Sequence, residues 1–201
     1  MTEWKLFDGD VPHVSTAEFH AGRERARHLE QPTHRPRLEA AAAFIASAAT
    51  IHAGRTGEKA TLSDLGCGDG GLLSLVQDRV DAWGYDFAPA NAEGWPERGV
   101  KAEALDVFGA DRDRVRFGDI TAVTEVLEHI ADPHGAVRWI GEHSPWIVAS
   151  SPWNETPERH DECHAWAFDH AGYRSLIEQG GYRVLRHETV LQFQVILGWR
   201  P

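Results

Sequence analysis

The sequence predicts an α/β fold built on a doubly wound, seven-stranded, mostly parallel sheet. Short apolar segments alternate with segments of helical pattern along most of the chain, which is typical of parallel strands joined by crossover helices. The last two apolar segments have almost nothing between them, so they must form an antiparallel hairpin. Since 201 residues can bury a full core, we expect one domain over 37–201, preceded by a helical extension over 1–36.

The extension is expected to contain one short helix. Ser15 is a typical N-cap residue with Glu18 three positions later, so this helix should run from Ser15 to Leu29. Pro32 and Pro36 then interrupt the chain. The alanine-rich run that follows predicts a helix from Arg37 to about His52, ended by the glycines at 54 and 57.

The sheet elements follow from apolar runs bounded by glycine, proline and charged residues. The expected strands are Ala60–Leu65, Ala82–Tyr85, Val100–Leu105, Ile120–Val126, Trp146–Ser150, Tyr182–Thr189 and Leu191–Trp199. The expected helices among them are Gly70–Arg79, Pro133–His143 and Asp169–Gln179.

Composition excludes several classes of protein. The formal net charge of −11 disfavours a nucleic-acid partner. The N-terminal residues lack the basic flank and apolar run of a signal peptide, and no stretch approaches the roughly 18 consecutive apolar residues of a membrane span. Cys67 and Cys163 form no CxxC pair. A soluble cytoplasmic protein without a membrane partner is expected.

A glycine-rich turn joins the first strand of the expected sheet to its helix. It runs from Asp64 to Gly71 and reads DLGCGDGG. Glycines permit a tight turn and let a ligand approach the backbone closely, and the free N–H groups of the next helix favour a carboxylate-bearing ligand. Dinucleotide-binding proteins use a similar pattern, and a tight turn alone would also explain it.

Two further acids narrow the choice of ligand. Asp86 ends the second strand, where a nucleotide fold places its ribose-binding carboxylate. Asp106 ends the third strand and should face the same crevice. Three acids around one pocket suit a cationic, ribose-bearing cofactor, whereas a pyrophosphate would be repelled by Asp64 and Asp69.

These motifs, in this order, resemble those of class I S-adenosylmethionine-dependent methyltransferases over roughly residues 37–199. The resemblance implies a Rossmann-like fold, S-adenosyl-L-methionine as cofactor and S-adenosyl-L-homocysteine as product. It implies the following cofactor contacts: Gly66, Cys67 and Gly68 against the methionine part, Asp64 at its amine, Asp86 at the ribose, Phe87 against the adenine, Asp106 at the adenine amine and Val107 nearby.

The stretch Thr124–Ile130, TEVLEHI, resembles the family's fourth motif, which borders both cofactor and acceptor, so Glu125 is expected at the cofactor. If a helix starts directly after it, Glu125, Glu128 and His129 share one face and could hold a divalent cation. This spacing resembles that of ubiquinone-pathway O-methyltransferases and of the enzymes that 2′-O-methylate small RNAs, in which a later histidine, here His164, completes the site. The same Glu-His pair also occurs without metal, so a metal is not favoured.

The segment after the fifth strand should form the wall of the acceptor pocket. His160 and His164 would share a face if it were helical, but three ligands within five residues, with Cys163 between them, suit zinc poorly. His164 and Trp166 are expected to line the pocket. His129 and His164 are the candidate general bases, although positioning alone supplies much of the rate of a methyl transfer.

Segments before the first strand often close over the cofactor in this family, which makes His28 and His34 candidate lid residues, with plain surface histidines as the simpler interpretation. Tryptophans near the expected pocket, Trp95, Trp153 and Trp166, favour a small apolar or aromatic acceptor methylated on oxygen or nitrogen. The alternatives are a metal-dependent RNA 2′-O-methyltransferase, an NAD-dependent oxidoreductase and a non-catalytic binding module. The oxidoreductase is disfavoured because no tyrosine is followed by a lysine four residues later.

Overall fold

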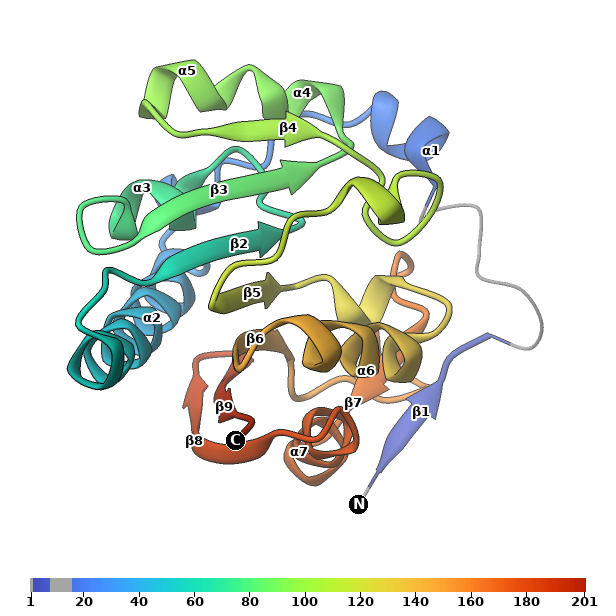
Figure 1. The fold of residues 1–201 in the computed structure, drawn as a ribbon. Helices are drawn as coiled ribbons and strands as arrows, with labels where there is room; N and C mark the ends of the chain where they lie inside the picture. The colour runs from blue at the N-terminus through green and yellow to red at the C-terminus, as the bar shows by residue number, and fades with distance from the viewer. Residues whose placement is uncertain (1, 8–15) are drawn as a thin grey trace.

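The computed structural model describes residues 2–7 and 16–201 (Figure 1). Its main sheet has seven strands in the order β4-β3-β2-β5-β6-β9-β8. The strands are β2 (Thr61–Leu65), β3 (Asp81–Asp86), β4 (Ala102–Ala104), β5 (Ile120–Thr124), β6 (Trp146–Pro152), β8 (Arg183–Val190) and β9 (Phe193–Trp199). All pairs from β4 to β6 are parallel, and β9 is antiparallel to both of its neighbours. The predicted sheet is confirmed.

Two apolar layers cover the sheet because successive strand residues point to opposite faces. Ala122 packs with α2 (Arg35–Thr56) and α3 (Gly71–Val76), whereas its neighbour Val123 packs with α6 (Pro133–His143) and α7 (His170–Gln179). Two short helices, α4 (Pro89–Ala92) and α5 (Gly94–Arg98), lie beside β4 in Figure 1.

The expected helix from Ser15 to Leu29 is wrong over most of its length. The structure has a short α1 (Ala17–Ala21), capped by Thr16 and ended at Gly22, and a 3-10 helix over His28–Glu30. Ser15 itself lies outside the described residues. Between the two helices, contacts with the body of the protein replace helical hydrogen bonds, as when the Ala26 N–H donates to Asn91 Oδ1 at 2.9 Å.

Pro36 lies in the first turn of a helix instead of interrupting the chain. It occupies the first turn of α2, where the missing N–H would have no helical partner in any case. The helix therefore begins at Arg35 and runs to Thr56, beyond both ends of the expected range, and ends at Gly57 in the left-handed conformation (φ 76°).

A second, two-stranded sheet is absent from the sequence-based prediction. In it β1 (Glu3–Lys5) pairs antiparallel with β7 (Trp166–Phe168). Three residues are too few for a recognisable alternation, and the partners are more than 160 positions apart. This pairing attaches the start of the chain to the segment just before α7. In the described ranges no helix is long and apolar enough to cross a lipid bilayer.

Candidate functional site

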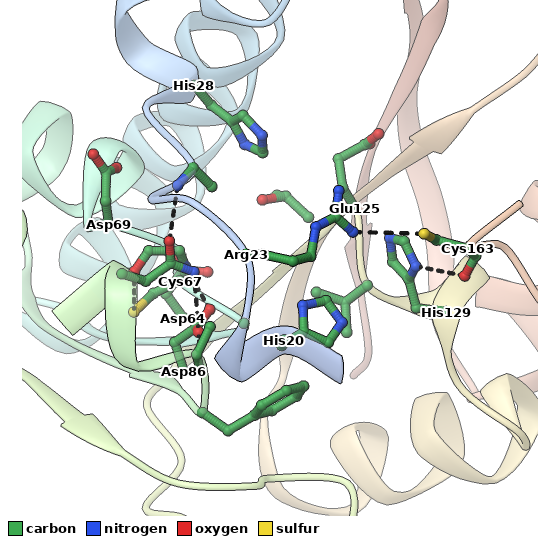
Figure 2. Close-up of a pocket in the computed structure, with 18 of the residues that line it drawn as sticks. His20, Arg23, His28, Asp64, Cys67, Asp69, Asp86, Glu125, His129 and Cys163 are labelled. Carbon is green, nitrogen blue, oxygen red and sulfur yellow. Dashed lines mark hydrogen bonds between the residues drawn. The ribbon is translucent and has the colours of Figure 1, made fainter. Parts of the chain in front are cut away.

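A cavity of about 990 Å³ opens where β2, β3 and β5 end (Figure 2). This is near the top of the roughly 300–1,000 Å³ typical of ligand sites. Its walls are the glycine-rich turn, the ends of these strands, the turn after β5, the loop after β6 and the segment 16–38.

The glycine-rich turn needs glycine for two different reasons. Gly66 and Gly68 both have positive φ values, 78° and 56°. A Cβ on Gly66 would lie 2.5 Å from Cγ2 of Val126, so only glycine fits there, whereas a Cβ on Gly68 would meet no protein atom within 4 Å. The turn is held against β3 because the N–H groups of Gly66 and Cys67 both donate to the Tyr85 carbonyl.

Asp86 is fixed beside this turn. Its Oδ2 accepts from the Gly68 N–H at 2.9 Å, and its Oδ1 accepts from the Ala88 N–H and the Asn91 amide at 2.8 and 3.2 Å. A carboxylate offers about four acceptor positions, so one position is left for a ligand hydroxyl. Burial raises the pKa of Asp86, and these three donors partly oppose that rise.

Asp64 is a buried carboxyl with no basic side chain paired to it among the described residues. It lines the cavity with 1% of its surface exposed, and its Oδ1 has no hydrogen-bond partner among the described residues. Burial, followed by the nearby charge of Asp86, raises its pKa to about 7. A cationic ligand group would relieve both effects.

Asp69 differs from the other acids of the turn. Its carboxylate accepts from Arg25 at 3.1 Å and from Arg98 at 2.6 Å. The expectation that Asp69 would repel a pyrophosphate is therefore wrong, because its charge is compensated. That argument now depends on Asp64 alone.

The remaining residues expected at the cofactor also reach the cavity. Phe87, Asp106 and Val107 line it together with Gly66, Cys67 and Gly68. The loop after β4 is closed on itself, since the Asp106 N–H donates to Asp111 Oδ2 at 3.0 Å. The structure thus brings the sequence-predicted set together at one place.

The turn after β5 does not form the expected helix face. Glu125 has a φ of 58°, and only a 3-10 helix, Leu127–His129, follows it. The Glu125 carboxylate accepts from Ser150 Oγ at 2.8 Å and lies 3.9 Å from Nε of Arg37. Glu125 is therefore not part of the group of ligand atoms that Glu128 forms with His129 and His164.

Glu128, His129 and His164 do converge: one potential ligand atom of each lies within 4.8 Å of the others. Glu128 is 1% exposed, and neither carboxylate oxygen has a hydrogen-bond partner among the described residues. Burial, followed by repulsion from Glu125, raises its pKa well above the usual range.

Both histidines of this group are oriented through Nδ1. His129 donates to the Cys163 carbonyl at 3.0 Å, and His164 donates to the Glu155 carboxylate at 2.6 Å. Because these partners only accept, each Nε2 is left to bind a proton or a metal. Burial, followed by the neighbouring His164, lowers the pKa of His129 to about 4.

Arg37 is a site residue that the sequence interpretation missed. It is 1% exposed and lines the cavity, where its guanidinium contacts Ser150 Oγ at 3.3 Å and Nδ1 of His28 at 3.4 Å. Its Nε has no hydrogen-bond partner among the described residues. Its position in the sequence could have identified it, because Arg37 lies four residues before Ala41 and seven before Phe44. This spacing places the arginine on the buried apolar face of α2.

The segment before α2 forms one wall of the cavity. His28 and His34 both line it, and their rings stack at 4.5 Å. Burial, followed by the charge of Arg37, lowers the pKa of His28 to about 3. Figure 2 shows His20, Arg23 and His28 beside the cavity.

Of the two residues expected to line the acceptor wall, His164 lines the cavity and Trp166 does not. No helix joins His160 to His164, because a turn occupies this stretch. Among the described residues that line the cavity there is no tryptophan. Trp95 instead donates to the Gly68 carbonyl, Trp153 to that of Leu191 and Trp166 to that of Ala131. The indoles therefore give no support for an aromatic acceptor.

Comparison with known proteins agrees with this geometry. A family model described as a methyltransferase domain matches residues 33–194. No protein with a curated description matches the sequence.

Three solved structures illustrate the similarity of the fold. The N-methyltransferase NodS from Bradyrhizobium japonicum WM9 with S-adenosyl-L-homocysteine has a TM-score of 0.65 at 15% identity, covering 92% of this chain and 96% of that one. Magnesium protoporphyrin IX methyltransferase from Synechocystis PCC 6803 with S-adenosylmethionine gives 0.61 at 12%, covering 94% of each. An O-methyltransferase family protein from Burkholderia thailandensis gives 0.62 at 12%, covering 83% of this chain but only 55% of that one.

Proposed function

Since the chain belongs to the class I S-adenosylmethionine-dependent methyltransferase family, we propose that it transfers a methyl group from S-adenosylmethionine to an oxygen or nitrogen of a small-molecule acceptor. The observation that carries this proposal is the convergence of Asp64, Asp86 and Asp106 on the glycine-rich turn at one cavity. The net charge of −11 supports a small molecule over a nucleic acid.

The residues present fit this cofactor. Asp64 would face its ammonium group, Arg37 its carboxylate, and the remaining acceptor position of Asp86 a ribose hydroxyl. Asp106 would accept from the adenine amine, with Phe87 and Val107 against the ring. The segment before residue 37, which carries His28 and His34, would cover the cofactor.

The cofactor carries a methyl group on a positively charged sulfur. When bound, it would supply this methyl group to a lone pair of the acceptor, with the carbon–sulfur bond broken as the new bond forms. The residues of the cavity would contribute by positioning, which supplies much of the rate of such a transfer. The acceptor atom then loses a proton. His129 and His164 are the candidate bases, each with Nδ1 already donated and Nε2 free to accept.

We expect calorimetry to show that S-adenosylhomocysteine binds the full chain and that its affinity falls as the pH is lowered. Below about pH 7 the cofactor-free Asp64 carries a proton, which must leave before the carboxylate can face the ligand's ammonium. The affinity should therefore fall by up to about tenfold per pH unit between pH 7 and pH 6. The stability of the cofactor-free protein changes in the opposite sense, because a raised carboxyl pKa favours the folded state at lower pH.

The control for this experiment is Asp64→Asn, which cannot ionise and should bind with little dependence on pH in this range. NAD should not bind in the same assay. Binding of NAD without binding of S-adenosylhomocysteine would overturn the proposed function, and an unchanged pH dependence in Asp64→Asn would reject the role of Asp64.

A divalent cation is a separate, secondary proposal. Glu128, His129 and His164 would hold it, with Glu125 outside the set, and when bound it would polarise the acceptor. We expect millimolar Mn²⁺ to raise the melting temperature of the wild-type protein and not that of Glu128→Gln. Glu125→Gln is the matched control and should keep the Mn²⁺ response. Absence of any response to Mg²⁺, Mn²⁺ and Zn²⁺ in the wild type would exclude the ion.

A further inference from the structure

Three arginines line the cavity, and they differ in how their charges are compensated. Arg25 pairs with Asp69 at 3.1 Å and also with Glu97. Arg37 lies 3.9 Å from Glu125. Among the described residues, Arg23 has no carboxylate oxygen within the 4.0 Å of an ion pair. It is therefore an exposed cation of the cavity wall without an ion-pair partner among these residues, in a chain whose net charge is −11.

Arg23 contacts a thiol and an aromatic ring, and neither neutralises the positive charge of its guanidinium. Its guanidinium donates to Sγ of Cys163 at 3.5 Å and lies 5.5 Å from the centre of the Phe19 ring. A thiol is a weak hydrogen-bond acceptor and a phenyl ring carries no net charge, so neither contact supplies a counter-charge to the guanidinium. His20 lines the same cavity, and burial, followed by the charge of Arg23, lowers its pKa.

The chain around Arg23 is tied to the body of the protein. Two residues later, Arg25 forms its buried ion pair with Asp69, and the next N–H, that of Ala26, donates to Asn91. In Figure 2 the guanidinium of Arg23 points toward Cys163 and His129, away from Asp64 and Asp86. Arg23 thus faces the part of the cavity that the cofactor residues leave for the acceptor.

We propose that the methyl acceptor carries an anionic group, a carboxylate or a phosphate, and that Arg23 binds this group. An arginine fork can donate two parallel hydrogen bonds to either anion. The net negative charge of the protein repels an anionic acceptor, so binding of such an acceptor requires a positive charge at the site. With Arg37 assigned to the carboxylate of the cofactor, the cavity provides one arginine for each of two anions. This inference rests on the proposed function.

The test uses the full chain saturated with S-adenosylhomocysteine and three small probes, benzoate, phenyl phosphate and the neutral benzamide, titrated by saturation-transfer NMR. We expect millimolar binding of at least one anion and binding of benzamide that is weaker by about tenfold. The anion that binds more tightly identifies the class of group, carboxylate or phosphate.

Variants of one segment then locate the contact. Arg23→Gln should weaken anion binding about tenfold, and Arg23→Lys should retain part of it. Arg27→Gln, an exposed arginine of the same segment that does not line the cavity, should bind as the wild type does. Equal binding of anions and benzamide, no binding of either anion, or unchanged binding in Arg23→Gln would each overturn this inference. Failure to bind S-adenosylhomocysteine would instead count against the proposed function.

Discussion

Replacing Arg37 with glutamine is expected to lower the affinity for S-adenosylhomocysteine about a hundredfold, or about 2.7 kcal/mol, and to leave the affinity for 5′-methylthioadenosine nearly unchanged. The two ligands share the adenosine and the sulfur, but only the first has the amino acid carboxylate. Arg37 is 1% exposed, and its Nε has no hydrogen-bond partner among the described residues, so it can still donate to a carboxylate. Calorimetric titration of both ligands measures the difference directly.

The control for this variant addresses Glu125, which loses its nearest cation when Arg37 is removed. A buried charge left without its partner can cost about 3–5 kcal/mol of stability. The double variant Arg37→Gln/Glu125→Gln removes both charges, so it should melt closer to the wild type and still discriminate poorly between the ligands. An equal loss of affinity for both ligands in Arg37→Gln would show that the arginine supports the fold and does not bind the carboxylate.

Gly68→Ala is expected to weaken binding of S-adenosylhomocysteine at least about tenfold, whereas Gly99→Ala should leave it unchanged. Both glycines have positive φ, 56° and 64°, and a Cβ on either meets no protein atom within 4 Å. Each alanine should therefore cost a similar conformational penalty, about 1–2 kcal/mol. Only Gly68 lines the cavity, so only its methyl group would occupy space that the cofactor needs.

Thermal melting and calorimetry together test this pair of glycines. We expect the melting temperatures of Gly68→Ala and Gly99→Ala to fall by similar amounts. The two variants should differ only in their affinity for S-adenosylhomocysteine. If both variants bind S-adenosylhomocysteine as the wild type does, the cofactor does not pack against Gly68.

The pattern of apolar runs was sufficient to predict the main sheet and the two helical layers. Strand positions such as Ala122 and Val123 are buried on opposite faces, and a fully buried parallel strand reads as a continuous apolar run. The place of Asp64, Asp86 and Asp106 followed as well, because parallel strands bring their carboxyl ends to one edge. Gly66 was recognisable from the glycine pattern of the turn, although part of the reason that only glycine fits there is the side chain of Val126, sixty positions away.

Several features of the site depend on contacts between distant segments and could not be predicted. The cap residue Ser15 predicts a helix from Ser15 to Leu29, but Arg25 and Ala26 instead bind Asp69 and Asn91. Such contacts override a modest helix propensity. The indoles of Trp153 and Trp166 donate to the backbone carbonyls of Leu191 and Ala131, and neither tryptophan lines the cavity.

What the sequence by itself determined about this protein is its sheet, its family and the edge at which the acids gather, because local pattern and strand direction are sufficient for these. Only the tertiary structure decided the charges at the site. It paired Asp69 with arginines, placed Glu125 beside Arg37 and outside the group of Glu128 with the two histidines, buried Arg37 and left Arg23 without an ion-pair partner among the described residues. The physical reason is that the charge a ligand meets depends on which distant side chains lie within a few ångströms, and neither spacing nor composition specifies those distances.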